Sequence, residues 1–114
     1  RQEIGRKIKR HERLGVWHHR RRIGFKRRVM KNLMEAKNEI IIVGDKLNIE
    51  MLSGRLKRNK KDDVDVVHHV VDDGASLVII DREKLMVIPR ERDADGLEIL
   101  LPSLARSVAS LHQG

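Results

Sequence analysis

Aspartates stand where the hydrophobic runs of this chain end, and carboxylates in such positions can do chemistry. Asp45 follows one β-branched run, Asp81 ends another, and Asp93 and Asp95 precede the last amphipathic segment. Acids that converge at the carboxyl ends of parallel strands can hold Mg²⁺ for phosphoryl chemistry. One hypothesis is therefore a metal-dependent enzyme acting on nucleic acid with these four residues at its site. We favour the competing interpretation, in which they form turns and cap helices, because Asp is common in both places.

The same acids carry two resemblances to known families. A strand that ends in an acid and is followed by a later Asp-x-Asp resembles the toprim catalytic domain of primases and topoisomerases. The stretch from Asp93 to Leu97 also resembles a segment of sulfate-transporter and anti-sigma-antagonist domains, where a Ser commonly precedes the Gly; here that residue is Asp95. Because one short match serves two unrelated families, we assign the chain to neither.

Lysine and arginine are concentrated in the first third of the sequence. Residues 1–37 carry a net charge of +11, whereas the remaining residues carry −3. A concentrated basic surface gains free energy by releasing counterions from phosphates, so the asymmetry indicates a polyanion partner. We expect a nucleic-acid-binding protein rather than an enzyme, with RNA favoured over DNA because Arg is abundant and no DNA-binding motif is recognisable. The cations expected to contact phosphates are Arg6, Lys7, Lys9, Arg10, Arg13, Arg20, Arg21, Arg22, Lys26, Arg27, Arg28 and Lys31.

Other partners fit a basic segment too. An acidic protein could dock on it, which would make the chain a regulatory protein-interaction domain. Two further hypotheses are that the segment binds a membrane surface or that it is a solvated face without a partner. Trp17 and Phe25 lie among the bases and could stack on nucleotides. The spacing of Phe25 with Val29 and Leu33 favours core packing for Phe25, and Trp17 stays open between the two roles.

Histidine and cysteine usage points away from metal chemistry. The histidines include two doublets, His18–His19 and His68–His69. Adjacent residues on a helix diverge by about 100°, so neither doublet would chelate one metal if helical. We expect no metal and no cofactor, Mg²⁺ entering only with the enzyme hypothesis. Zero Cys removes disulfides and thiolate sites and is compatible with a reducing cytosol, so we expect a cytoplasmic protein. No apolar run approaches the roughly 20 residues that cross a bilayer.

Hydrophobic spacing predicts the elements that position these residues. Phe25, Val29 and Leu33 predict a helix from about residue 20, apolar on one side and cationic on the other. The run 39–43 predicts a buried strand that feeds a helix capped by Asp45, with Ile49, Leu52 and Leu56 on its buried face. The runs 76–81 and 85–88 predict two further strands, and their three-residue link favours a hairpin because it is too short for a parallel crossover.

The sequence patterns predict helices in two more segments. Val64, Val67, His68 and Val71 share one helical face, and the Asp-Asp-Gly sequence that follows is typical of a helix end. From about residue 96 onward the leucine spacing predicts an amphipathic helix, which Pro102 would kink or split.

These elements predict an α/β fold with a small mixed or parallel sheet of about three strands covered by helices. We divide the chain into a basic N-terminal arm and helix, 1–37, and a small α/β domain, 38–114. Residues 1–15 are mostly charged and indicate a weak helix or an arm that orders on contact. An exposed sheet edge could pair two copies into a homodimer. The first residue is Arg rather than Met, as in an excised fragment or a processed product.

Overall fold

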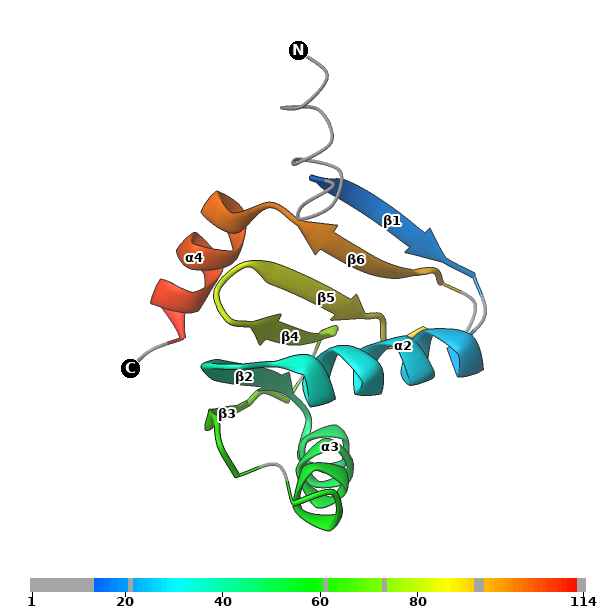
Figure 1. The fold of residues 1–114 in the computed structure, drawn as a ribbon. Helices are drawn as coiled ribbons and strands as arrows, with labels where there is room; N and C mark the ends of the chain where they lie inside the picture. Colours follow the sequence, from blue (N-terminus) through cyan, green and yellow to red (C-terminus); the bar gives the residue numbers. More distant parts are fainter. Residues whose placement is uncertain (1–13, 21, 61, 73, 92–93, 113–114) are drawn as a thin grey trace.

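The computed structural model describes residues 14–20, 22–60, 62–72, 74–91 and 94–112. Within them the chain forms six strands and three helices (Figure 1). In chain order the elements are β1 (Gly15–His19), α2 (Arg22–Glu35), β2 (Glu39–Gly44), α3 (Lys46–Arg58), β3 (Asp65–Val70), β4 (Ser76–Ile80), β5 (Lys84–Ile88), β6 (Gly96–Leu100) and α4 (Pro102–Leu111). No helix of the described part is long and apolar enough to span a membrane.

All six strands belong to one mixed sheet, in the order β1-β6-β5-β4-β2-β3. β2 and β3 are parallel and are joined by α3, while every other neighbouring pair is antiparallel. The predicted small sheet of about three strands is therefore wrong, although the α/β character remains. The strands missed by the sequence patterns are β1, β3 and β6, of which β1 and β3 are the two edges of the sheet.

Two predicted helices are corrected by this sheet. Residues 65–70 form a strand, because their valines and histidines pair in parallel with β2 along its whole length and β-branched residues suit a half-buried pleated surface. Residues 96–100 form β6, which lies between β5 and β1. The predicted C-terminal helix is right only from Pro102 onward. Pro102 begins α4 rather than kinking it, since proline fits the first helical turn, where its missing N–H needs no partner.

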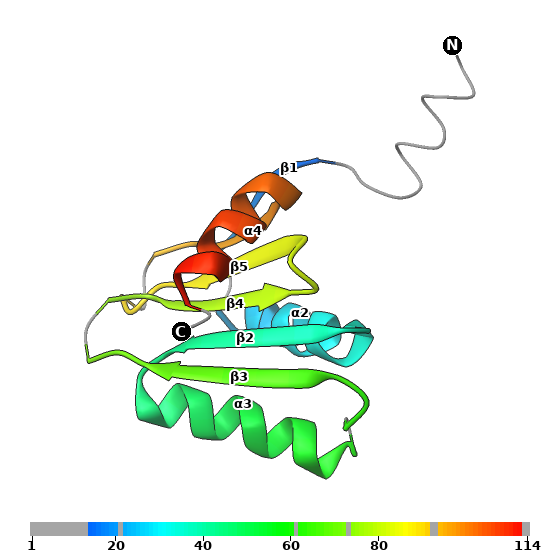
Figure 2. The same cartoon turned by 90° about the vertical axis from the view of Figure 1, so that its left-hand side faces the viewer.

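The sheet is covered on both faces, as its unalternating central strands predict. Ile40 and Ile42 of β2 face α2 and α3, whereas Ile41 and Val43 face α4. Figure 2 shows α4 in front of the sheet and α2 behind it. The larger core lies on the side of α2 and α3, where Phe25, Val29, Leu33, Ile49, Leu52 and Leu56 are all buried as the spacing predicts.

The predicted turns and caps of the centre are confirmed. Asp45 precedes α3 and its side chain accepts a hydrogen bond from the Asn48 N–H at 2.8 Å. β4 and β5 form the expected antiparallel hairpin. β1 and α2 are built into the same unit, since β1 pairs with β6 and α2 packs on the sheet.

Candidate functional site

Exposed cations of α2 lie opposite its buried face. Lys26, Arg27 and Lys31 are solvent-exposed, while Phe25, just before them, and Val29, between Arg27 and Lys31, are buried. The helical period of 3.6 residues separates these two sets onto different sides. Arg20, just before the helix, is exposed as well. The other predicted phosphate contacts, apart from Arg28, lie outside the described residues or have side chains that do: Arg6, Lys7, Lys9, Arg10, Arg13, Arg21 and Arg22.

A second set of cations comes from the end of α3. Arg55, Lys57 and Arg58 occupy its last turn, where positive charge also complements the helix dipole, and Lys60 follows. All four are exposed. Both helices pack on the same face of the sheet. We call these exposed cations of α2, of the last turn of α3 and of the residue shortly after it the cationic face: Lys26, Arg27, Lys31, Arg55, Lys57, Arg58 and Lys60.

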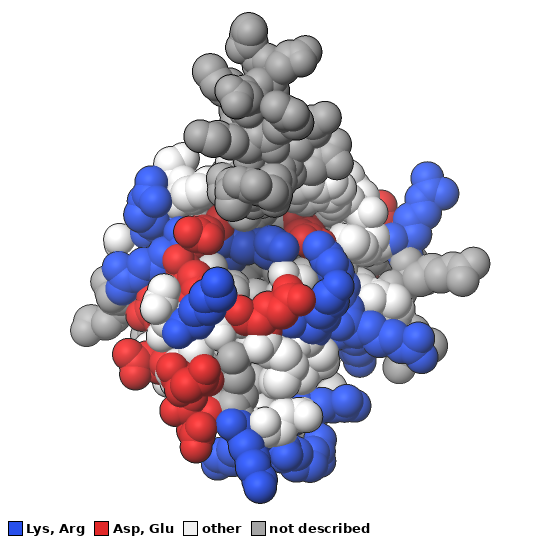
Figure 3. Space-filling view, viewed as in Figure 1, with Lys and Arg blue, Asp and Glu red and all other residues white. Residues whose placement is uncertain are grey.

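Figure 3 shows blue side chains over the first half of α2 and over α3, with uncharged surface between them. Acidic side chains occupy the centre and the left of the same view. No ion pair joins a member of the cationic face to an acid within the described residues. A cavity of about 390 Å³ opens between the two helices, with Lys26, Arg27 and Arg55 among its lining residues.

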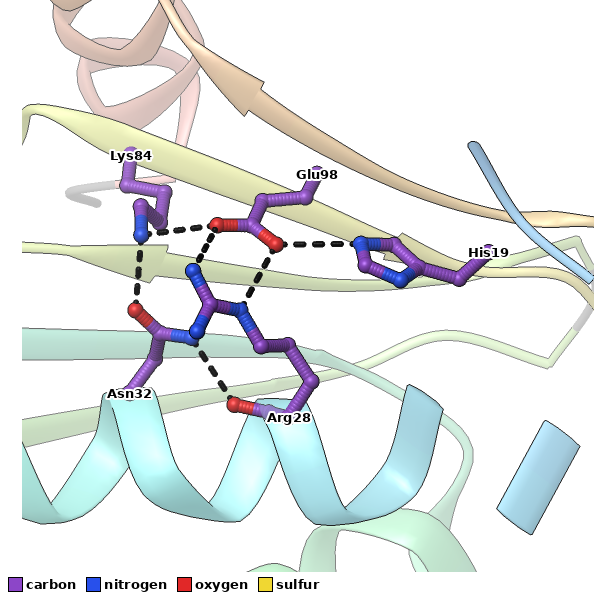
Figure 4. A network of polar contacts seen from close by, with 5 residues as sticks. All are labelled: His19, Arg28, Asn32, Lys84 and Glu98. Atoms are coloured by element: carbon purple, nitrogen blue, oxygen red, sulfur yellow. Dashed lines mark hydrogen bonds and ion pairs between the residues drawn. The ribbon is translucent and has the colours of Figure 1, made fainter. Parts of the chain in front are cut away.

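Arg28 differs from its neighbours because it is bound to an acid inside the protein (Figure 4). Its Nε and Nη2 each donate to Glu98 of β6 at 2.9 Å. The Glu98 side chain is only 4% exposed and also contacts Lys84 Nζ at 2.8 Å and His19 Nε2 at 3.0 Å. Asn32 closes the group: its Oδ1 accepts from Lys84 at 2.8 Å and its Nδ2 donates to the Arg28 carbonyl oxygen at 2.8 Å.

The charges in this group stabilise one another. Burial alone would raise the pKa of the Glu98 carboxyl, but the hydrogen bonds and charges of Arg28 and Lys84 outweigh it and lower that pKa to about 2. The hydrogen bond to Glu98 in turn raises the pKa of Arg28. This network therefore ties α2, β5, β6 and β1 together. Sequence reasoning missed Glu98 because it placed residues 96–100 on a helix. In that helix the leucines form the buried face, and Glu98 is not one of its members.

Asp45 and Asp81 do not come together. Asp45 follows the end of β2, where it caps α3. Asp81 lies beside the start of β2 and accepts backbone hydrogen bonds from Lys37, Asn38 and Glu39, at 3.0, 2.7 and 3.0 Å. These two acids are thus at opposite ends of one strand.

The remaining two carboxylates are Asp93 and Asp95. Asp93 lies outside the described residues, and Asp95 Oδ2 is 3.9 Å from His18 Nδ1. Among the residues described, no three His, Cys, Asp or Glu side chains are grouped so as to hold a metal ion. The contacts of Asp45 and Asp81 are those of a helix cap and a turn anchor.

Each histidine doublet lies on a strand, so its two rings point to opposite faces of the sheet. His68 Nε2 is 2.9 Å from Ser53 Oγ of α3, whereas the His69 ring lies 5.5 Å from that of His112, after α4. His19 stacks on Phe25 with ring centroids 5.1 Å apart. The rings diverge as expected, but through strand alternation rather than helical rotation. Trp17 also lies on β1, opposite Glu98 in register, and is 37% exposed.

The fold has a counterpart among solved structures. The chain is similar to TrmBL2, an archaeal chromatin protein whose structure is described as showing a novel mode of DNA binding. The TM-score is 0.55 at 16% sequence identity, and the match covers 97% of this chain but only 57% of the other. At this identity the likeness concerns the fold alone. No protein-family model matches the chain, and no curated protein matches its sequence.

Proposed function

We propose that this protein binds nucleic acid through the cationic face, by contacts to phosphates rather than to bases. The observation that carries the proposal is the separation of the cations into two groups. Arg28 and Lys84 are paired with the nearly buried Glu98, and Arg82 is paired with Glu39. The seven cations of the cationic face are exposed on or just after two helices that pack on the same face of the sheet, and they form no ion pair with a described acid.

Such a surface has a physical reason to prefer a polyanion. Exposed cations grouped on one side create a positive potential that persists over a Debye length of about 8 Å at physiological salt. A nucleic acid releases condensed counterions when its phosphates are neutralised there. The net charge of +8 adds a long-range attraction of the same sign.

The fold comparison supports the same class of partner. TrmBL2, which shares the fold, is described as a DNA-binding chromatin protein. This chain spans a little over half of that one, so the activity of the whole protein is not carried over. We include in the proposal our sequence-based preference for RNA over DNA. We also include the eight further Arg and Lys of residues 1–22 that we expect to contact phosphates.

The test is a fluorescence-anisotropy titration of the full chain with matched RNA and DNA duplexes and single strands, over a range of salt concentrations. Arg27→Gln on the cationic face is compared with Arg106→Gln, which removes the same charge from an exposed position on α4, across the sheet. We expect Arg27→Gln to weaken binding and to reduce the log–log salt slope by about one, as for a lost phosphate contact. Arg106→Gln should leave both unchanged.

Each outcome has a clear meaning. A steep salt slope with a selective effect of Arg27→Gln supports the proposal, and the relative affinities decide between RNA and DNA. Equal losses from the two variants would mean that net charge, not this face, drives binding. Absence of binding at low salt would overturn the proposal.

A further inference from the structure

The cavity between α2 and α3 combines an apolar interior with a cationic rim. Its deep lining comes from Val29, Leu52 and Ile88, which are 1%, 3% and 8% exposed. Met30 and Met51 also line it, and Met51 is 38% exposed. The volume, about 390 Å³, lies within the range of pockets that hold small organic molecules.

The charged residues that line the cavity are all cations. Lys26 and Arg27 of α2 and Arg55 of α3 are its charged residues, and no acid is among the nine described residues that line it. The remaining polar residue is Asn48, whose Nδ2 donates to Ser76 Oγ at 3.0 Å. That bond holds the amide in place, so one polar group of the wall is pre-organised.

We propose that this cavity binds a small amphipathic anion, in which a carboxylate is attached to an alkyl or aryl body. The carboxylate would lie among Lys26, Arg27 and Arg55, where it relieves the repulsion between three like charges. The body would displace water from the apolar interior, which is the favourable term for such pockets. Methionine side chains are flexible and polarisable, so Met30 and Met51 can adapt to bodies of different shape.

A nucleic-acid backbone does not account for this cavity. Phosphates need the cations of the rim but leave the apolar interior unfilled, since a sugar-phosphate chain carries no apolar body of this kind. The inference therefore goes beyond the proposed function, although the three rim cations belong to the cationic face.

The chain carries its own reporters for a test. It has four methionines, of which Met30 and Met51 line the cavity, while Met34 and Met86 do not. We would label the methionine methyl groups with ¹³C and titrate the full chain with octanoate, with its neutral analogue octanamide, and with acetate, which lacks the body. Octanoate should shift the Met30 and Met51 signals saturably, whereas the fully buried Met86 should stay in place.

Variants test separately the contact of the cations with the carboxylate and the contact of the apolar interior with the alkyl body. Arg55→Gln should weaken octanoate binding about tenfold, because a charge-assisted contact is lost. Arg58→Gln is the matched control, since it removes an equal charge from the same helix outside the cavity. Met51→Trp should block the cavity while keeping every cation, with Met30 as the remaining reporter. Nucleic-acid affinity should survive Met51→Trp, so failure of this proposal and failure of the proposed function are distinguishable.

Three outcomes would overturn the inference. Equal binding of octanoate and octanamide would remove the role of the cations. Equal loss from Arg55→Gln and Arg58→Gln would place the anion elsewhere on the surface. Shifts of Met34 and Met86 as large as those of Met30 and Met51, or no saturation at millimolar octanoate, would show that no specific pocket is occupied.

Discussion

Arg28 and Glu98 lie 70 positions apart in the sequence and meet through two parallel hydrogen bonds, each 2.9 Å long. The pair joins α2 to β6. Arg27, the residue before Arg28 on the same helix, faces solvent. Two adjacent arginines therefore have different roles, one in holding the fold and one on the cationic face.

Replacing each arginine by Gln should separate stability from binding. Arg28→Gln leaves a nearly buried carboxylate with fewer donors, and we expect a loss of about 1 to 2 kcal/mol in the free energy of unfolding. Arg27→Gln should change stability by less than about 0.5 kcal/mol, as exposed substitutions usually do. Urea denaturation gives both values. If Arg27→Gln proved the more destabilising, the assignment of roles would be reversed.

Acid should destabilise the protein through Glu98. Because its pKa is lowered to about 2 in the folded state, the unfolded chain binds the proton more readily. The stabilisation is fully present above the ordinary pKa of Glu, about 4.3, and is lost as the pH falls toward 2. We expect melting temperatures to fall over this window. In Glu98→Gln the protein should be less stable at neutral pH, and its melting temperature should fall less steeply with acid; an unchanged slope would contradict the prediction.

Asp81 should anchor the start of β2 through its three backbone hydrogen bonds. Burial would raise the pKa of this carboxyl, but the N–H groups of Glu39, Lys37 and Asn38 lower it overall. We expect Asp81→Ala to cost about 2 kcal/mol, since it leaves those donors without their acceptor. Asp81→Asn should cost less, because Asn keeps an acceptor and tolerates the left-handed backbone at this residue, where φ is 53°.

The control for Asp81 is Glu83→Ala, an exposed acid in the same turn. It should leave the free energy of unfolding within about 0.5 kcal/mol of the parent. Chemical denaturation of the three variants checks the order. A result in which Asp81→Ala and Glu83→Ala are equally mild would show that the three hydrogen bonds contribute nothing net.

Two glycines should respond to alanine in opposite directions. A Cβ at Gly96 would come within 2.3 to 2.7 Å of the Phe25 ring, so Gly96→Ala forces the ring or β6 to move. Overpacking of this kind costs about 1 to 3 kcal/mol. Gly54 lies inside α3 with open space where a Cβ would go, so Gly54→Ala should stabilise by about 1 kcal/mol. Thermal unfolding of both variants tests the pair, and stabilisation by Gly96→Ala would refute the close packing at Phe25.

The centre of the fold could be predicted because its signals are local. Each of these signals is contained in one short segment of the chain. They are the helical spacing of Phe25 and Leu33, the β-branched run 39–43 and the helix cap at Asp45. The short link before residue 85 excluded a crossover and predicted the hairpin. None of these inferences needed a partner from elsewhere in the chain.

The sequence by itself therefore determined the amphipathic elements, the hairpin and the excess of cations on α2, because helical and strand periodicity sort side chains within a short window. Only the tertiary structure decided that residues 65–70 and 96–100 are strands and that β1 exists at all. A short apolar run fits a helix or a strand equally well, and its backbone hydrogen bonds depend on a distant partner, as Trp17 opposite Glu98 shows. The role of Arg28 also depends on a distant residue. Its charge is evident from the sequence, but only the tertiary structure shows that it pairs with Glu98, 70 positions away, and is not left unpaired for a ligand.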